Sequence, residues 1–205
     1  MKRLLNLSTI RKQASYLLLA ACTVSIMATS STAMAASAKA LIDDFSNETN
    51  NSWGLPRQQM ADTMVGGGST SEANVKNGIM QLSGEIVPPR GQPGWVSTVL
   101  LLDGEGKPVN VSEYSGIRMS VKVSSGALSL SANSTDVTNF DYHSSAVMVV
   151  PDGKFHDVDI PFDSLKRMWS EQTPLNAKTI ASLSIVAFSL KKAPFDYEID
   201  EISFY

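Results

Sequence analysis

Cysteine is almost absent from this sequence. The only cysteine among the 205 residues is Cys22, and it lies in an apolar run close to the N-terminus. If that run is removed by processing, the remaining chain has no thiol. Disulfide bonds, a cysteine nucleophile and thiolate metal ligands are then excluded.

Histidine is nearly as scarce, because the chain has only His143 and His156, and their spacing is not that of paired metal ligands. This disfavours a zinc site. The Gly-x-Ser-x-Gly turn of many serine hydrolases is missing as well. We therefore predict a binding protein without catalytic residues. A pair of carboxylates flanking a glycosidic bond is the enzymatic alternative, since the sequence gives no distance between its acids.

The first 35 residues have the three parts of a secretory signal peptide. Residues 1–13 carry four cations and no acid, residues 14–28 form an apolar run, and Ala33-Met34-Ala35 fits the small-x-small cleavage rule. The apolar run is shorter than the roughly 20 residues of a membrane-spanning helix. We predict cleavage after Ala35 and a periplasmic or secreted protein.

A second processing route involves the cysteine. The segment Leu19–Cys22 reads LAAC, which has the form of a bacterial lipobox with an acylated cysteine. Apolar residues continue beyond it at Val24 and Ile26, whereas a lipoprotein usually turns polar there. A lipoprotein anchored through Cys22 is therefore the alternative to cleavage after Ala35.

Basic residues are too few for nucleic-acid binding. The chain has 17 basic and 20 acidic residues, and four of the basic ones lie in the predicted signal peptide, which leaves a net charge of −7 on residues 36–205. Such a surface repels phosphates. No second long apolar run occurs, so we expect no transmembrane span in the mature chain.

Alternation of apolar and polar residues with period two dominates the rest of the chain. Ile117, Met119, Val121 and Val123 share one face of a predicted strand. Similar alternation, or an apolar run suited to a central strand, recurs at 79–86, 95–102, 128–132, 144–150, 156–162 and 183–187. We predict a single all-β domain over residues 36–205, a jelly-roll β-sandwich with a few short helices.

Local signals place a turn, a bulge and a helix. Asn77-Gly78 is a strong hairpin-turn dipeptide. The apolar parity changes between Ile199 and Ile202, which predicts a β-bulge near Asp200–Glu201. Residues 162–172 are the best helix candidate, with Asp163 as N-cap.

Two pairs of acids indicate a candidate metal site. Asp43 and Asp44 lie in the predicted first strand, and Asp200 and Glu201 lie at the predicted bulge of the last one. The first and last strands of a jelly roll are often neighbours, so oxygen ligands from both can hold Ca²⁺, the one cofactor we consider. The alternative is that these acids are ordinary surface charges.

The stretch QQMADTMVGGGSTSEANV, residues 58–75, contains three consecutive glycines. No lysine follows them as in a phosphate-binding loop, and an all-β chain lacks the helix of a dinucleotide-binding turn. The apolar pair Met64-Val65 precedes the glycines and is expected to be buried, which argues against a linker. We predict a tight or positive-φ turn that joins packed segments.

Several motifs in register resemble the complex I intermediate-associated protein 30 family. They are Trp53 with DTMVGGGS at 62–69, NGIMQLSGEI at 77–86, GWVSTV at 94–99, YSGIRMSVKV at 114–123 and FDYEIDEISFY at 195–205. The resemblance covers about residues 41–205. It implies a galactose-binding-like jelly roll, similar to many carbohydrate-binding modules. One departure is Met64-Val65, where the family more often has Val-Met.

The resemblance also implies a role. The family is named for assisting assembly of respiratory complex I, so we expect an exported, chaperone-like binding or assembly factor with a protein partner. Its expected binding patch is Trp53, Asp62, Gly66, Gly67 and Ser69.

The alternative role is a carbohydrate-binding module of the cell envelope, with a glycan as partner. It would use exposed aromatic residues and the polar loop 133–143. Candidates are Trp95, Tyr142 and Trp169. We expect Trp169 to be exposed, and Trp53 and Trp95 to pack in the core.

Overall fold

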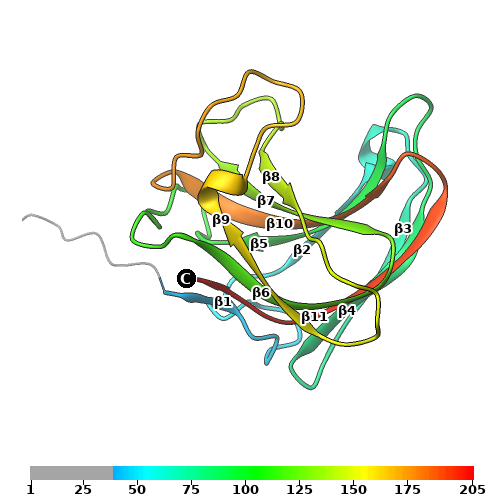
Figure 1. Ribbon diagram of the computed structural model, residues 1–205, viewed down its shortest axis with the longest axis horizontal. Coiled ribbons are helices and arrows are strands. Elements are labelled where there is room, and N and C mark those ends of the chain that lie inside the picture. The colour runs from blue at the N-terminus through cyan, green and yellow to red at the C-terminus, as the bar shows by residue number, and fades with distance from the viewer. Residues whose placement is uncertain (1–38) are drawn as a thin grey trace, which may run out of the picture. The chain divides into compact units, whose positions relative to one another are not determined.

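The computed structural model describes residues 39–205, so the predicted signal peptide and lipobox lie outside the described residues. The chain forms two antiparallel β-sheets that pack face to face (Figure 1). This confirms the predicted all-β jelly-roll sandwich. Within the described residues, no helix is long and apolar enough to cross a membrane.

The first sheet, here called the β11 sheet, has six strands. Its order is β3-β4-β11-β6-β9, and β1 also pairs with β11. The strands are Leu41–Asp43 (β1), Thr70–Lys76 (β3), Ile79–Ile86 (β4), Gly116–Ser125 (β6), His156–Pro161 (β9) and Ala193–Phe204 (β11). The first and last strands are therefore neighbours, as expected for a jelly roll.

The second sheet, here called the β10 sheet, has five strands in the order β2-β5-β10-β7-β8. They are Gln58–Ala61 (β2), Gly94–Leu101 (β5), Ala127–Ser134 (β7), His143–Ala146 (β8) and Ile180–Ser189 (β10). Two short 3₁₀ helices, Asp62–Val65 (η1) and Phe162–Ser164 (η2), follow β2 and β9.

The core lies between the sheets and follows the predicted parity. Ile117, Met119 and Val121 of β6 are fully buried, and the same holds for Leu183 and Ile185 of β10. Because successive strand residues point to opposite faces, the residues between them lie on the outer faces of the sandwich. Those outer faces are where a ligand has access.

The predicted turn and bulge are both present. Asn77 and Gly78 join β3 to β4 with φ values of 53° and 78°, as a type I′ hairpin turn requires. The register of β11 against β6 shifts between Ile199 and Glu201, which leaves Asp200 as the extra residue. The bulge keeps Ile199 and Ile202 in the core although their spacing breaks the period of two.

Two expectations about secondary structure were wrong. The predicted helix over 162–172 is only the 3₁₀ turn Phe162–Ser164, and Asp163 lies inside it. The backbone N–H groups of residues 168–170 donate to the Asp141 carboxylate instead of to helical carbonyls. The apolar run 144–150 is not a central strand, because β8 is a short edge strand that ends at Ala146.

Candidate functional site

The glycine stretch surrounds a buried carboxylate. Asp62 is fully buried at the start of η1. Its Oδ1 accepts the Ser69 N–H at 3.0 Å, and its Oδ2 accepts the Ser69 hydroxyl at 2.6 Å and the Trp95 N–H at 3.0 Å. The Ser69 hydroxyl oxygen in turn accepts the Val87 N–H. Asp62 therefore ties the loop to β5 and to the segment after β4.

The glycines fit around this carboxylate. Gly66 ends η1 in the left-handed region, with φ of 87°. Gly67 has ordinary φ, but a Cβ there would overlap the carboxyl group of Asp62. The loop therefore needs glycine at these two positions for two different reasons.

In the predicted patch, Asp62 and Ser69 are buried, Trp53 and Gly67 are half-buried and Gly66 is exposed. Trp53 is half-buried against the core, and its Nε1–H donates to the Leu41 carbonyl at 2.7 Å. The exposed side chains of this loop are Met64 and Val65, which we expected to be buried. The side chains that define the motif serve the scaffold, and the apolar pair beside them faces solvent.

The four acids of the predicted calcium site do not form one cluster. Asp43 is buried and pairs with the Arg57 guanidinium at 2.6 and 2.8 Å, while Asp44 accepts hydrogen bonds from Ser46 and Ser52. Within residues 39–205, no group of three or more acidic, histidine or cysteine side chains is placed to hold a metal ion. Calcium binding therefore stays a prediction to which the geometry adds no support.

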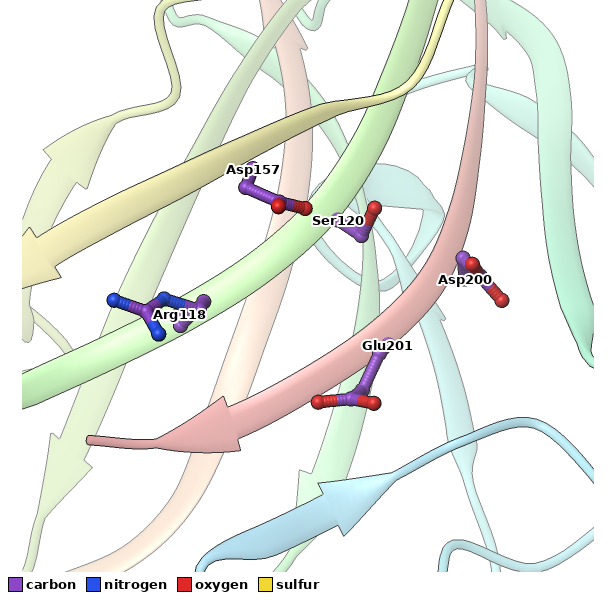
Figure 2. A pocket seen from close by; sticks show the side chains of 5 residues that line it. All are labelled: Arg118, Ser120, Asp157, Asp200 and Glu201. Carbon is purple, nitrogen blue, oxygen red and sulfur yellow. The ribbon is translucent and has the colours of Figure 1, made fainter.

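Asp200 and Glu201 lie at the bulge of β11, on the outer face of the β11 sheet. They line a shallow depression with Arg118, Ser120 and Asp157, and their carboxyl groups do not converge on one point (Figure 2). The charged side chains on the face around them form ion pairs with one another. Arg118 pairs with Asp159 at 2.6 Å, and Lys122 pairs with Glu198 at 2.7 Å. The outer face of the β11 sheet is therefore a solvent-exposed surface of ion pairs.

The outer face of the β10 sheet has the opposite character. Its strands place small polar and apolar side chains on this side and no ionisable one, throughout five strands that all lie in the described part of the chain. The residues are Gln58, Met60, Trp95, Ser97, Val99, Leu101, Ala127, Ser129, Ser131, Asn133, Ser144, Ala146, Ser182, Ser184, Val186 and Phe188. We call this surface the serine face. Trp95 lies on it, half-buried, so it is not a core residue as we expected.

Two polar side chains on the serine face are buried without a partner in the protein. Ser97 is 5% exposed and Asn133 is 8% exposed. The Asn133 amide donates to Ser182 and Ser184, but its Oδ1 and the Ser97 Oγ make no hydrogen bond within the protein. Buried polar atoms are almost always paired, so these two atoms are exceptions; both are covered by the protein, and the hydroxyls that a ligand can reach are those of the half-buried serines around them, such as Ser129, Ser131 and Ser184.

A pair of loops borders the serine face at the β8 edge. Ser144 of β8 exchanges both backbone hydrogen bonds with Lys166, so the segment after η2 continues the sheet. The buried Asp141 carboxylate accepts the N–H groups of Met168, Trp169 and Ser170 at 2.8, 3.1 and 2.6 Å. Figure 1 shows these loops on one side of the β10 sheet and the loops around η1 on the other.

The Asp141 carboxylate is held in its charged form. Burial raises the pKa of Asp141, but the hydrogen bonds from residues 168–170 outweigh burial and bring the pKa below the usual aspartate value. The stability that this carboxylate contributes is present above pH of about 4 and is lost as the pH falls through the lower, folded-state pKa. The loop pair is therefore fixed at neutral pH.

Neither histidine stands in a catalytic arrangement. His143 is buried, and its Nε2 lies 2.7 Å from the Thr173 carbonyl. His156 is partly exposed and lies 2.9 Å from Asp152. Both side chains hold loops in place.

Trp95, Trp169 and Tyr142 were predicted from the sequence as candidate contacts, but the serines of the serine face were not. Serine at alternate positions of two strands, Ser129 and Ser131 in one and Ser182 and Ser184 in the other, was the available signal. We read it only as the polar side of each strand.

The fold and these surfaces define the class of protein, a galactose-binding-like jelly-roll domain of the kind found in binding modules. Residues 44–199 match the family described as Complex I intermediate-associated protein 30 (CIA30). The match spans more than half of the chain, and the chain belongs to this family. No curated protein matches the sequence.

Solved structures share the fold at low identity. The family 11 carbohydrate-binding module of the cellulosomal cellulase Lic26A-Cel5E of Clostridium thermocellum is 18% identical with a TM-score of 0.58, over 82% of this chain and 95% of that chain. The same type of module from Clostridium thermocellum, in complex with a β-1,3-1,4-mixed-linked tetrasaccharide, is 19% identical with a TM-score of 0.57, over 82% and 96%. The agarase AgWH50C is 11% identical with a TM-score of 0.53, over 80% of this chain and 24% of that chain.

Proposed function

We propose that this protein is a non-enzymatic module that binds a neutral glycan through the serine face. The observation that carries the proposal is the hydroxyl-lined serine face, whose five strands present half-buried serines and no ionisable side chain. A sugar hydroxyl can donate and accept hydrogen bonds without bringing a charge. Half-buried aromatic side chains at one end, Trp95 and Phe188, offer apolar contact to a sugar ring.

The comparisons support carbohydrate as the ligand class. The similar family 11 modules are named as carbohydrate-binding, and one was solved with a tetrasaccharide. The five strands of the serine face carry no ionisable side chain, which favours a neutral glycan over one that carries carboxylate or sulfate groups; Lys166 adds an exposed cation at the β8 edge.

Affinity electrophoresis with soluble polysaccharides tests the proposal. We expect a neutral polysaccharide, with mixed-linked β-1,3-1,4-glucan and agarose as the first probes, to retard the protein, and the acidic alginate to have no effect. Ser131→Ala should weaken binding about tenfold, because Ser131 is half-buried in the middle of the serine face and the sugar loses one hydrogen bond. The same change should leave the melting temperature unchanged, since the hydroxyl that it removes is partly exposed.

Ser120→Ala is the matched control, because Ser120 lies on the outer face of the other sheet. It should leave glycan binding unchanged. If none of a broad set of neutral polysaccharides binds, or if Ser120→Ala weakens binding as much as Ser131→Ala, the serine face is not the glycan site.

An assembly or chaperone-like role, as the family name implies, is the second candidate function. The exposed Met64 and Val65 favour it, because they stand beside the glycine loop and contribute nothing to the core. A protein partner would use this end of the sandwich and not the serine face. Met64→Asp should then abolish binding to that partner while leaving polysaccharide binding intact.

We propose that the protein is exported and acts outside the cytoplasm, where glycans of the cell envelope are accessible. The cationic start, the apolar run and Ala33-Met34-Ala35 support this. Mass spectrometry of the protein from its host should find an N-terminus at Ala36. An acylated N-terminal Cys22 would show that the protein is a lipoprotein, and an intact Met1 would show that it is not processed.

A further inference from the structure

The loop pair at the β8 edge, residues 139–142 and 166–170, is cross-linked more heavily than a connecting loop requires. Besides the three bonds to Asp141, the Arg167 guanidinium donates to the Asp141 carbonyl at 3.2 Å and to Asn139 Oδ1 at 2.8 Å. The Asn139 amide donates to the Ser170 hydroxyl at 2.9 Å. Two segments far apart in sequence are thereby fixed as one rigid unit.

This rigid unit holds large apolar side chains in solvent. Phe140 is 78% exposed and Trp169 is 70% exposed. Phe140 also has a φ of 61°, which is unfavourable for a residue with a Cβ. Its ring lies edge to face against the Tyr142 ring, with 6.3 Å between the ring centroids. Folding alone gives no reason to accept both the strain and the exposure. Exposed apolar side chains on a fixed backbone are typical of a preorganised contact surface.

The unit is continuous with the serine face. Lys166 pairs with Ser144, whose side chain lies on that face, and Tyr142 precedes Ser144 by two residues. A ligand that lies across the serine face and passes over β8 therefore meets the aromatic loop pair next.

The length of the serine face also requires a long ligand. Trp95 at one end is level with Phe188 of β10, and Asn133 at the end near the loop pair is level with Ser182. Six strand residues separate these levels, a distance of about 20 Å. A single sugar ring cannot span both ends, whereas several linked sugars can.

We propose that Trp169 and Phe140 form a stacking platform that extends the serine-face site, so that the protein binds an internal stretch of a glycan chain and not a mono- or disaccharide. This inference rests on the proposed function. The aromatic side chains stack on the apolar face of a sugar ring, and the lock around Asp141 keeps them in position before the ligand arrives. Their place beside a hydroxyl-lined surface, with Lys166 as an exposed cation at its edge, favours a glycan over a protein partner.

Isothermal titration with the neutral polysaccharide that binds the wild-type protein, and with the disaccharide and hexasaccharide of the same linkage, tests the platform. Trp169→Ala should weaken binding of the polysaccharide and the hexasaccharide about tenfold, and Trp169→Phe should retain most of it. The disaccharide should bind weakly and be insensitive to both changes. The melting temperature of Trp169→Ala should match wild type, because this side chain is exposed.

Met64→Ala is the matched control, since Met64 is 69% exposed, close to the 70% of Trp169, but lies in η1. It should not change binding. If Ser131→Ala weakens binding and Trp169→Ala does not, the glycan-binding function stands and the platform is wrong. If Trp169→Ala weakens the disaccharide equally, the chain-length requirement is wrong. If the wild-type protein binds no neutral polysaccharide, the proposed function fails and the platform with it.

Discussion

Asp62→Ala is expected to destabilise the fold by about 3 kcal/mol or more. The substitution removes the acceptor of the Ser69 N–H, the Ser69 hydroxyl and the Trp95 N–H in a site without exposed surface. Each buried donor left unpaired costs about 1–3 kcal/mol. The free energy of unfolding, from urea titration at constant m-value, measures the effect.

The glycines of the same loop give a matched pair of variants. Gly66→Ala should cost about 1 kcal/mol, because φ is positive but space is open around the new Cβ. Gly67→Ala should cost about 2 kcal/mol or more, since its Cβ overlaps the Asp62 carboxyl group. In the Asp62→Ala background, the additional cost of Gly67→Ala should largely disappear, because the group it collides with is gone.

Unchanged stability of these variants would mean that the loop is not part of the scaffold. If Gly67→Ala and Asp62→Ala unfold at the wild-type urea concentration, the motif does not hold the fold together. Loss of a protein partner in such stable variants would make the motif a recognition surface, as the family resemblance first implied.

The sequence was sufficient to predict the sandwich, because parity along a strand is a local property. Ile117, Met119 and Val121 had to share a face whatever they packed against. The break in parity between Ile199 and Ile202 had to be absorbed by a bulge. Asn77-Gly78 had to form the turn, since both residues tolerate positive φ.

The site depends on pairs of residues far apart in sequence, which no local pattern shows. Nothing in the sequence near Asp43 indicated that its carboxylate would form an ion pair with Arg57. Residues 162–172 have a helical pattern but do not form a helix. The Asp141 carboxylate, more than twenty residues earlier in the chain, accepts the N–H groups of residues 168–170 instead. Met64 and Val65 looked like core residues because the sequence shows only that they are apolar.

The serine face was missed for a related reason. Serine at alternate strand positions is the ordinary polar side of a sandwich strand. Its meaning comes from the strand order, which places the serines of β7 and β10 side by side and surrounds Ser97 and Asn133 closely enough to bury them. Burial of an outward-facing hydroxyl is a property of the assembled sheet.

Arg57→Met is expected to destabilise the protein by about 3–5 kcal/mol. The Arg57 and Asp43 side chains are only 5% and 1% exposed, and the guanidinium also donates to the Asn47 carbonyl and lies over the Phe45 ring. Without it, the Asp43 carboxylate is left buried and without its cation, which is the expensive outcome for a buried ion pair. Thermal and urea unfolding measure the loss.

The chain provides its own control in an exposed pair of the same type. Arg118 holds Asp159 with two hydrogen bonds of 2.6 and 2.7 Å, but these side chains are 49% and 46% exposed. Arg118→Met should cost far less than Arg57→Met, because solvent screens the pair and hydrates the remaining carboxylate. The double variant Asp43→Asn, Arg57→Met should recover part of the loss, since no charge then stays buried alone. Equal costs for Arg57→Met and Arg118→Met would show that burial does not set the strength of the Asp43 pair.

If added Ca²⁺ restored the stability of Arg57→Met, the vacated Asp43 carboxylate would be able to take a metal ion in place of the guanidinium.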